Sequence, residues 1–316
     1  MANTQSLDLE STSSQYASVA DTAPLSITGN MTLMAWIKVE SDTLIAQTII
    51  GKWDVTNNRR SYALTITTAG ALALTLSSDG TAETTKTSNY AFLTATAEPG
   101  FGWQHVAVTY NAAAGTCKFY LNGVQDSSGS GLPTSIHNNI SSFAIGAQDV
   151  DATPDSFVDG LIDEVKVFNT ALTAAQVLNE MHLDGTENSP VGYWKLNNDY
   201  TDSSGNGATL TASGSPVFST TVPFSASGTT AELQARADNH MDSSATTTNN
   251  GTATTMGVGE SNIAVATLRT LIKFDLSSIP SGSTINSAFL LLQYSSDLTD
   301  SARVFNVFRV KRAWTE

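Results

Sequence analysis

Short stretches in which apolar and polar residues alternate follow one another along the chain, and each predicts a β-strand. From Trp103 to Tyr110 and from Cys117 to Gly123 the alternation is clean, and a turn at Gly115 joins the two strands. From Thr32 to Val39 apolar side chains lie on both faces, which is typical of a central strand. Many short strands separated by turns predict an all-β sandwich.

The segment from Gly160 to Val177 changes its period halfway. Its first part alternates as a strand, so the adjacent residues Asp163 and Glu164 are expected to point to opposite faces. After Asn169 the apolar residues recur at helical spacing behind Thr173, a suitable N-cap. A short helix is therefore predicted to follow this strand and to close off the sheet.

Two motifs in these segments resemble laminin-G-like domains, which are concanavalin A-like jelly rolls. One is the strand with Asp163-Glu164 and the helix after it, and the other is Trp103-Gln-His-Val-Ala-Val-Thr-Tyr110 with Phe119-Tyr-Leu-Asn-Gly123 behind it. The resemblance covers Ser6 to Phe224 and implies a jelly-roll β-sandwich with one short helix for residues 1–224. Domains of this family mostly bind sugars or proteins, so a binding function is expected.

A small and polar stretch at residues 225–230 has the composition of a linker, and a second domain is expected at residues 231–316. Its segment from Leu268 to Pro280 and the terminal Trp314-Thr-Glu316 resemble the β-sandwich family called DNRLRE domains. That family continues beyond its Trp-x-Glu, so an incomplete second β-sandwich is expected here. Unpaired strand edges would leave such a domain poorly packed or dependent on another chain.

The charge balance excludes some classes of partner. Lys and Arg total 15 against 29 Asp and Glu, which gives a formal net charge of −14. Phosphate binding needs a basic face, so neither nucleic acid nor an anionic membrane is expected as a partner. No apolar run is long enough to span a bilayer, and the first residues lack the pattern of a signal peptide.

The single cysteine, Cys117, alternates with apolar residues and is expected to be a buried, inert thiol. Secreted eukaryotic laminin-G domains often carry a disulfide, which one cysteine cannot form within the chain. The expectation is therefore a prokaryotic protein that is extracellular or lies at the cell surface.

The acidic loop before Gly160 offers the oxygen ligands that calcium prefers. Laminin-G-like domains frequently hold one calcium ion near the rim, and the resemblance implies a site made by Asp163 with Asp149 or Asp151. The loop does not have the spacing of an EF-hand. The alternative is a solvated acidic loop, with Asp163 hydrogen-bonded to the backbone.

Sugar recognition needs aromatic faces that stack on C–H surfaces and polar groups that pair with hydroxyls. One predicted loop and its flanks supply that mixture, and the candidate ligand-binding residues are Trp53, Asn57, Asn58, Arg59 and Tyr62. Trp36 and Trp194 lie within strongly patterned strands, which favours a core position for both.

No catalytic residues are predicted. A glycoside hydrolase of this fold needs two carboxylates on one face across a cleft, whereas Asp163 and Glu164 are adjacent in a strand. The leading hypothesis is a non-catalytic module that binds a polysaccharide or glycoprotein with calcium as a candidate cofactor. The alternatives are a structural spacer of a larger surface protein and, third, a glycoside hydrolase of the same fold.

Overall fold

The computed structural model of the chain describes residues 3–40, 45–91, 102–182, 187–223, 235–242, 259–261 and 266–274. Contacts divide the chain into two compact units, Met1–Ser227 and Gly228–Glu316, and each is described by itself. The predicted linker at residues 225–230 lies outside the described residues, as does most of the predicted second domain.

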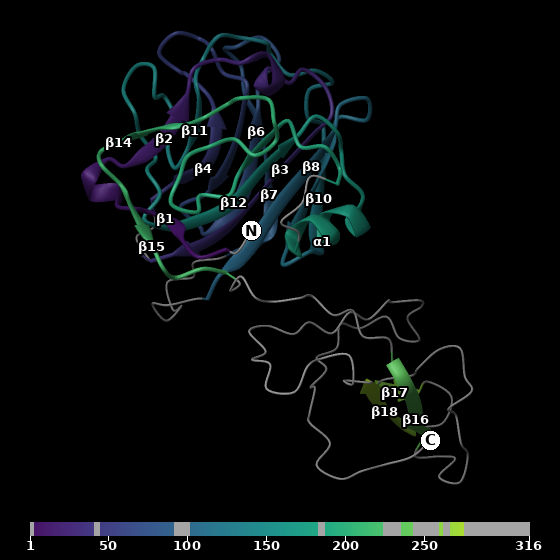
Figure 1. The fold of residues 1–316 in the computed structure, drawn as a ribbon. Coiled ribbons are helices and arrows are strands. Elements are labelled where there is room, and N and C mark those ends of the chain that lie inside the picture. Colours follow the sequence, from purple (N-terminus) through teal and green to yellow (C-terminus); the bar gives the residue numbers. More distant parts are fainter. Residues whose placement is uncertain are drawn as a thin grey trace. The chain divides into compact units, whose positions relative to one another are not determined.

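The first unit consists of two antiparallel sheets (Figure 1). The larger sheet has eight strands, and β13 pairs with β12 beside the main path. Along that path the order is β10 (Val124–Ser130), β9 (Thr116–Leu121), β8 (Gln104–Asn111), β3 (Met31–Val39), β12 (Gly160–Phe168), β1 (Ser6–Leu9) and β15 (Val217–Ser219), with β13 at Gly192–Trp194.

The second sheet of this unit has seven strands. Their order is β14 (Thr211–Ser213), β2 (Tyr16–Val19), β11 (Phe143–Ile145), β4 (Gln47–Lys52), β5 (Tyr62–Ile66), β6 (Ala71–Leu76) and β7 (Thr84–Ala91). Two short 3-10 helices, η1 (Ser11–Ser13) and η2 (Ala23–Leu25), lie in the loops on either side of β2.

The hydrophobic core lies between the two sheets, because alternate residues of the facing strands point inward. Strand β3 is central in its sheet, as predicted, and contributes Leu33, Ala35 and Ile37 to this core. Trp194 stacks on Phe143 with ring centroids 4.8 Å apart, which confirms its predicted core position. The all-β sandwich predicted from the pattern is confirmed.

A β-bulge interrupts strand β12 and changes the predicted facing of its side chains. The register against β3 shifts between Asp163 and Lys166, and Glu164 has a φ of 50°. Because of the extra residue, Val165 joins the core, while Glu164 accepts a hydrogen bond from the Tyr193 hydroxyl. The prediction that Asp163 and Glu164 point to opposite faces is therefore wrong.

The predicted helix is α1 (Ala174–His182), and Thr173 is its N-cap as predicted. The Thr173 hydroxyl accepts the Gln176 N–H at 3.3 Å, while the Gln176 side chain accepts the Thr173 N–H at 2.9 Å. This reciprocal pair is a capping box. The helix covers the outer face of the eight-stranded sheet, where the Trp36 indole donates to the Met181 carbonyl.

The second unit is described only at a three-stranded antiparallel sheet. Its order is β16 (Ala235–Asp242), β18 (Ala266–Phe274) and β17 (Gly259–Ser261). Strand β18 includes residues 268–274 of the segment from which a β-sandwich was predicted, and the rest of that segment lies outside the described residues. In the part of the chain that the structure describes, no helix is long and apolar enough to cross a membrane.

Candidate functional site

Four loops meet at one end of the seven-stranded sheet, and we call them the rim loops: residues 53–61, 77–83, 131–142 and 146–159. The backbone N–H of His137 donates to the Ser77 carbonyl at 2.8 Å, which joins the third loop to the second. The Asp149 N–H donates to the Trp53 carbonyl at 3.0 Å, which joins the fourth loop to the first. The Arg60 N–H donates to the Gly80 carbonyl at 3.3 Å, which joins the first loop to the second, so the four loops form one connected surface.

Asp54 organises the first rim loop. Its fully buried carboxylate accepts hydrogen bonds from the backbone N–H of Asn57 at 2.9 Å and from the Asn57 side-chain amide at 2.7 Å. Asn58 follows with a φ of 55°, a conformation that asparagine tolerates better than most residues. The sequence Asp-Val-Thr-Asn-Asn therefore forms a fixed turn.

Three of the predicted sugar-binding residues lie exposed on this turn. Asn57 and Asn58 are exposed, and the Arg59 side chain is 37% exposed. The Arg59 guanidinium lies 4.0 Å from the Asp54 carboxylate, whose two oxygens are already engaged by Asn57. Two amides and a guanidinium therefore present hydrogen-bond donors to solvent beside one another.

The two aromatic members of the predicted set are buried instead. Tyr62 is 0% exposed, its hydroxyl donates to the Leu25 carbonyl at 2.9 Å, and burial raises the pKa of that hydroxyl. Trp53 is 4% exposed and lies beneath the rim. The expectation of an aromatic stacking platform made by these residues is wrong, because both rings are buried.

The predicted calcium ligands accept hydrogen bonds from different parts of the chain. In the described part of the chain, one group of three or more Asp, Glu, His or Cys residues has all its ligand atoms within 4.8 Å of one another, and it contains none of the predicted ligands. The Asp149 carboxylate accepts the Val55 N–H, and Asp151 accepts the N–H and hydroxyl of Ser142 at 2.7 and 2.6 Å. These two aspartates hold the rim loops together.

Asp163 lies apart from the rim, on the face of β12 that α1 covers. It is 0% exposed and accepts hydrogen bonds from the Asn3 amide at 2.8 Å and from the Glu164 N–H at 2.9 Å. Burial, and secondly the neighbouring Glu164 carboxylate, raise the pKa of Asp163 well above its usual range. The contact with backbone N–H agrees with the alternative reading of this residue.

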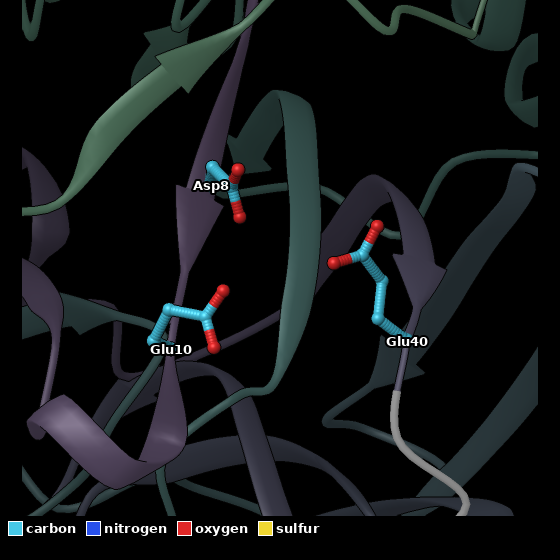
Figure 2. Close-up of side chains that lie close together, drawn as sticks. All are labelled: Asp8, Glu10 and Glu40. Carbon is cyan, nitrogen blue, oxygen red and sulfur yellow. The ribbon is translucent and has the colours of Figure 1, made fainter.

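The group with converging ligand atoms is Asp8, Glu10 and Glu40, whose carboxyl groups face one another across β12 (Figure 2). Burial raises the pKa of Asp8, and the charge of Glu40 raises it further. Burial likewise raises the pKa of Glu10. The sequence pattern does not predict this group. Asp8 and Glu10 lie two residues apart, but Glu40 follows a different strand, and only the sheet order brings it beside them.

A lysine that the sequence analysis did not single out supports the rim from below. Lys52 ends β4 and is fully buried, and its ammonium donates to the Asp21 carboxylate at 2.8 Å. It also donates to the carbonyls of Asn139 and Ser141, at 3.0 and 2.6 Å, in the third rim loop.

Comparison with known families agrees with this architecture. Residues 11–178 match the family described as the concanavalin A-like lectin/glucanases superfamily, and residues 229–316 match carbohydrate-binding module family 96. No curated protein matches the chain.

Solved structures share the fold at low sequence identity. A candidate carbohydrate-binding protein from Bacteroides ovatus has a TM-score of 0.55 and 19% identity, over 72% of this chain and 62% of its own. The chain thus spans less than two thirds of that protein. The heptameric SAP-like pentraxin of Limulus polyphemus has a TM-score of 0.44 and 16% identity, over 65% of this chain and 94% of its own. By its sandwich and by a family match over more than half its length, the chain belongs to the concanavalin A-like lectin/glucanases superfamily.

Proposed function

We propose that this protein is a non-catalytic, extracellular or cell-surface module that binds glycans through its rim loops. The observation that carries the proposal is the exposed turn of Asn57, Asn58 and Arg59, which the buried Asp54 carboxylate holds in shape. Side-chain amides and a guanidinium pair with sugar hydroxyls, and a fixed turn loses little entropy on binding. The match of residues 229–316 to a carbohydrate-binding module family supports the same class of ligand.

The apolar contribution to binding is aliphatic in this proposal. Val55 is 38% exposed in the first rim loop and Ile140 is 66% exposed in the third, whereas Trp53 and Tyr62 lie below the surface. The Asn139 amide donates to the Arg59 carbonyl at 2.8 Å, so Ile140 directly follows a residue anchored to the polar turn. Aliphatic side chains beside polar donors suit the mixed surface of a sugar ring.

The same binding experiment tests the calcium ion that was expected from the sequence. Because Asp149, Asp151 and Asp163 each accept protein hydrogen bonds, we expect glycan binding at the rim to persist in EDTA. Binding that requires added calcium would show that a metal ion takes part in ligand contact.

The test is affinity electrophoresis of the whole chain through gels that contain different polysaccharides, followed by titration calorimetry with any that retard it. Arg59→Gln and Asn58→Gly remove ligand-facing groups, and glycine keeps the positive φ of position 58. We expect each variant to lose about 1 kcal/mol of binding free energy, or about fivefold in affinity.

Lys118→Gln is the matched control, since Lys118 is an exposed cation on β9 of the other sheet. It should bind as the unaltered protein does. Equal affinity of Arg59→Gln, Asn58→Gly and the unaltered protein would rule out the rim as the binding surface. Turnover of a bound polysaccharide would contradict the non-catalytic part of the proposal.

A further inference from the structure

Lys52 is buried to a degree that is unusual for lysine. Its side chain is 0% exposed, and lysines are almost never fully buried unless they are paired. It pairs in register with Phe143 on one side and Tyr62 on the other, both of which belong to the core. The ammonium therefore lies at the end of the core, directly below the rim loops.

Three acceptors saturate the three donors of this ammonium. They are the Asp21 carboxylate at 2.8 Å and the carbonyls of Asn139 and Ser141 at 3.0 and 2.6 Å. The same Asp21 oxygen accepts the Ser26 hydroxyl at 2.7 Å. A carboxylate with two backbone carbonyls is the kind of oxygen set that protein loops offer to a metal cation.

The third rim loop carries this interaction to the ligand-facing turn. The Asn139 side-chain oxygen accepts the Ser141 N–H at 2.9 Å and the Ser141 hydroxyl at 2.6 Å. The nitrogen of the same amide donates to the Arg59 carbonyl at 2.8 Å. A chain of contacts thus leads from the Lys52 ammonium through Asn139 to Arg59.

Apolar residues can often replace both partners of a buried ion pair without loss of stability, but they cannot supply the hydrogen-bond donors that Lys52 provides. The apolar Met has a side chain of similar length, but it would leave the carbonyls of Asn139 and Ser141 without their donor. The ammonium therefore supplies donors that help to fix the position of the third rim loop.

We propose that Lys52 is a positioning residue of the rim: its ammonium serves as a built-in cation that holds the third rim loop, and through Asn139 the Arg59 turn, in the ligand-binding arrangement. The expected effect of Lys52 on ligand binding rests on the proposed function of the rim. Its effect on the position of the loops does not, so experiments can contradict either one without the other.

The first experiment compares hydrogen exchange of the whole chain with that of Lys52→Met. Loss of the ammonium should speed exchange about tenfold in peptides from residues 131–142 and 53–61, because buried acceptors lose their donor. Peptides from β8 and β9 should be unchanged. The affinity for a polysaccharide that the unaltered protein retains should fall about tenfold as well, with EDTA present or absent.

The matched control is the double variant Lys166→Met with Glu180→Met. It removes Lys166, which is also buried and whose ammonium donates to the Glu180 carboxylate at 2.9 Å under α1. Exchange in the rim loops and polysaccharide affinity should both stay at the level of the unaltered protein.

Chemical rescue separates the charge of Lys52 from its bulk. In Lys52→Ala, n-propylammonium replaces the missing atoms and should restore slow exchange in both rim loops, whereas the neutral 1-propanol should not. Unchanged exchange in Lys52→Met, or equal rescue by 1-propanol, would overturn the proposal. If the unaltered protein binds no polysaccharide but exchange responds as described, the positioning role stands and the proposed glycan function fails.

Discussion

The titration of Asp163 should contribute strongly to the pH dependence of this protein's stability. Its pKa is raised by burial and by the Glu164 carboxylate, so the folded protein keeps this proton at pH values where the unfolded chain loses it. The contribution of Asp163 to stability is therefore fully present below its unfolded pKa of about 3.9 and is lost as pH rises through the raised value. The raised pKa values of Asp8, Glu10 and Asp149 act in the same direction.

Asp163→Asn should stabilise the first domain at pH 7 and flatten the dependence of its unfolding free energy on pH. The neutral amide has the shape of the carboxyl group, and it can donate to the Asn3 side-chain oxygen, which has no hydrogen-bond partner among the described residues. We expect a gain of about 1 to 3 kcal/mol, measured by urea unfolding between pH 4 and pH 8.

The control for this variant is Asp199→Asn, at an exposed aspartate in a surface turn. It should change the unfolding free energy little at either pH. A loss of stability in Asp163→Asn at pH 7 would show that the buried group is needed as a carboxylate.

The sequence predicts the position of a single side chain well where burial decides the role of that residue. The alternation of β3 predicts buried positions for Trp36 and Leu33, and both are buried; Cys117 is also buried as predicted, with its pKa raised to about 11 by burial. It fails for Trp53 and Tyr62, because an aromatic residue at a strand end fits the core and a ligand surface equally well. For Tyr62, the register of β5 against β4 decides between them.

At the scale of elements, α1 is held to its sheet by a buried ion pair. The Lys166 ammonium donates to the Glu180 carboxylate and to the Glu180 carbonyl, both at 2.9 Å. The Asn188 N–H and side-chain amide donate to the other Glu180 oxygen, at 3.1 and 2.7 Å. The Glu180 carboxylate thus joins α1 both to β12 and to the segment that follows α1.

Glu180→Ala should cost about 3 to 5 kcal/mol of unfolding free energy, because it leaves the Lys166 ammonium buried without its carboxylate. Chemical denaturation monitored by tryptophan fluorescence measures this loss. Asn179→Ala, on the exposed side of the same helix, is the control and should cost little. A loss below about 1 kcal/mol in Glu180→Ala would mean that the ion pair does not anchor the helix.

Gly123 should tolerate no side chain beneath the same helix. It has a φ of 77°, and a Cβ atom there would lie 2.5 Å from Cδ1 of Leu178 in α1. We expect Gly123→Ala to lower the melting temperature by several degrees, since backbone strain and the displaced helix together cost about 1 to 3 kcal/mol. Gly102→Ala is the control, because an added Cβ meets no atom there within 4 Å.

Most inner strands could be predicted from the sequence, but two edge strands could not. β7 and β10 end their sheets and consist largely of Thr, Ser, Gln and Asn residues without apolar alternation. An edge strand needs few buried side chains, so its sequence lacks the period that identifies inner strands. The bulge at Glu164 also escaped prediction, because one inserted residue shifts every later side chain to the other face.

At the scale of the whole molecule, the functional clusters depend on sheet order rather than on local sequence. Lys52 and Asn139 lie far apart in the sequence, and the pairing of β4 with β11 brings them together. The carboxyl groups of Asp8 and Glu40 meet because β12 lies between β1 and β3. Motifs can predict the sandwich, but a jelly-roll strand order must be known before such clusters can be placed.

The division into two units predicts that the first unfolds by itself. Residues 1–227 should give the same melting temperature as the corresponding transition of the whole chain, because the core between the two sheets consists entirely of residues from that unit. Differential scanning calorimetry of both proteins measures this. A markedly lower melting temperature for residues 1–227 would show that the second unit stabilises the first.

The central claim, that the rim loops bind a glycan, is tested most directly by nuclear magnetic resonance. The measurement is a titration of the isotope-labelled chain with an oligosaccharide from a polysaccharide that retards it. The account predicts that the largest shift changes fall on the amides of Asn57, Asn58 and Arg59 and on those of the third rim loop. Changes confined to the outer face of β1, β12 and β15, or to residues 228–316, would contradict it.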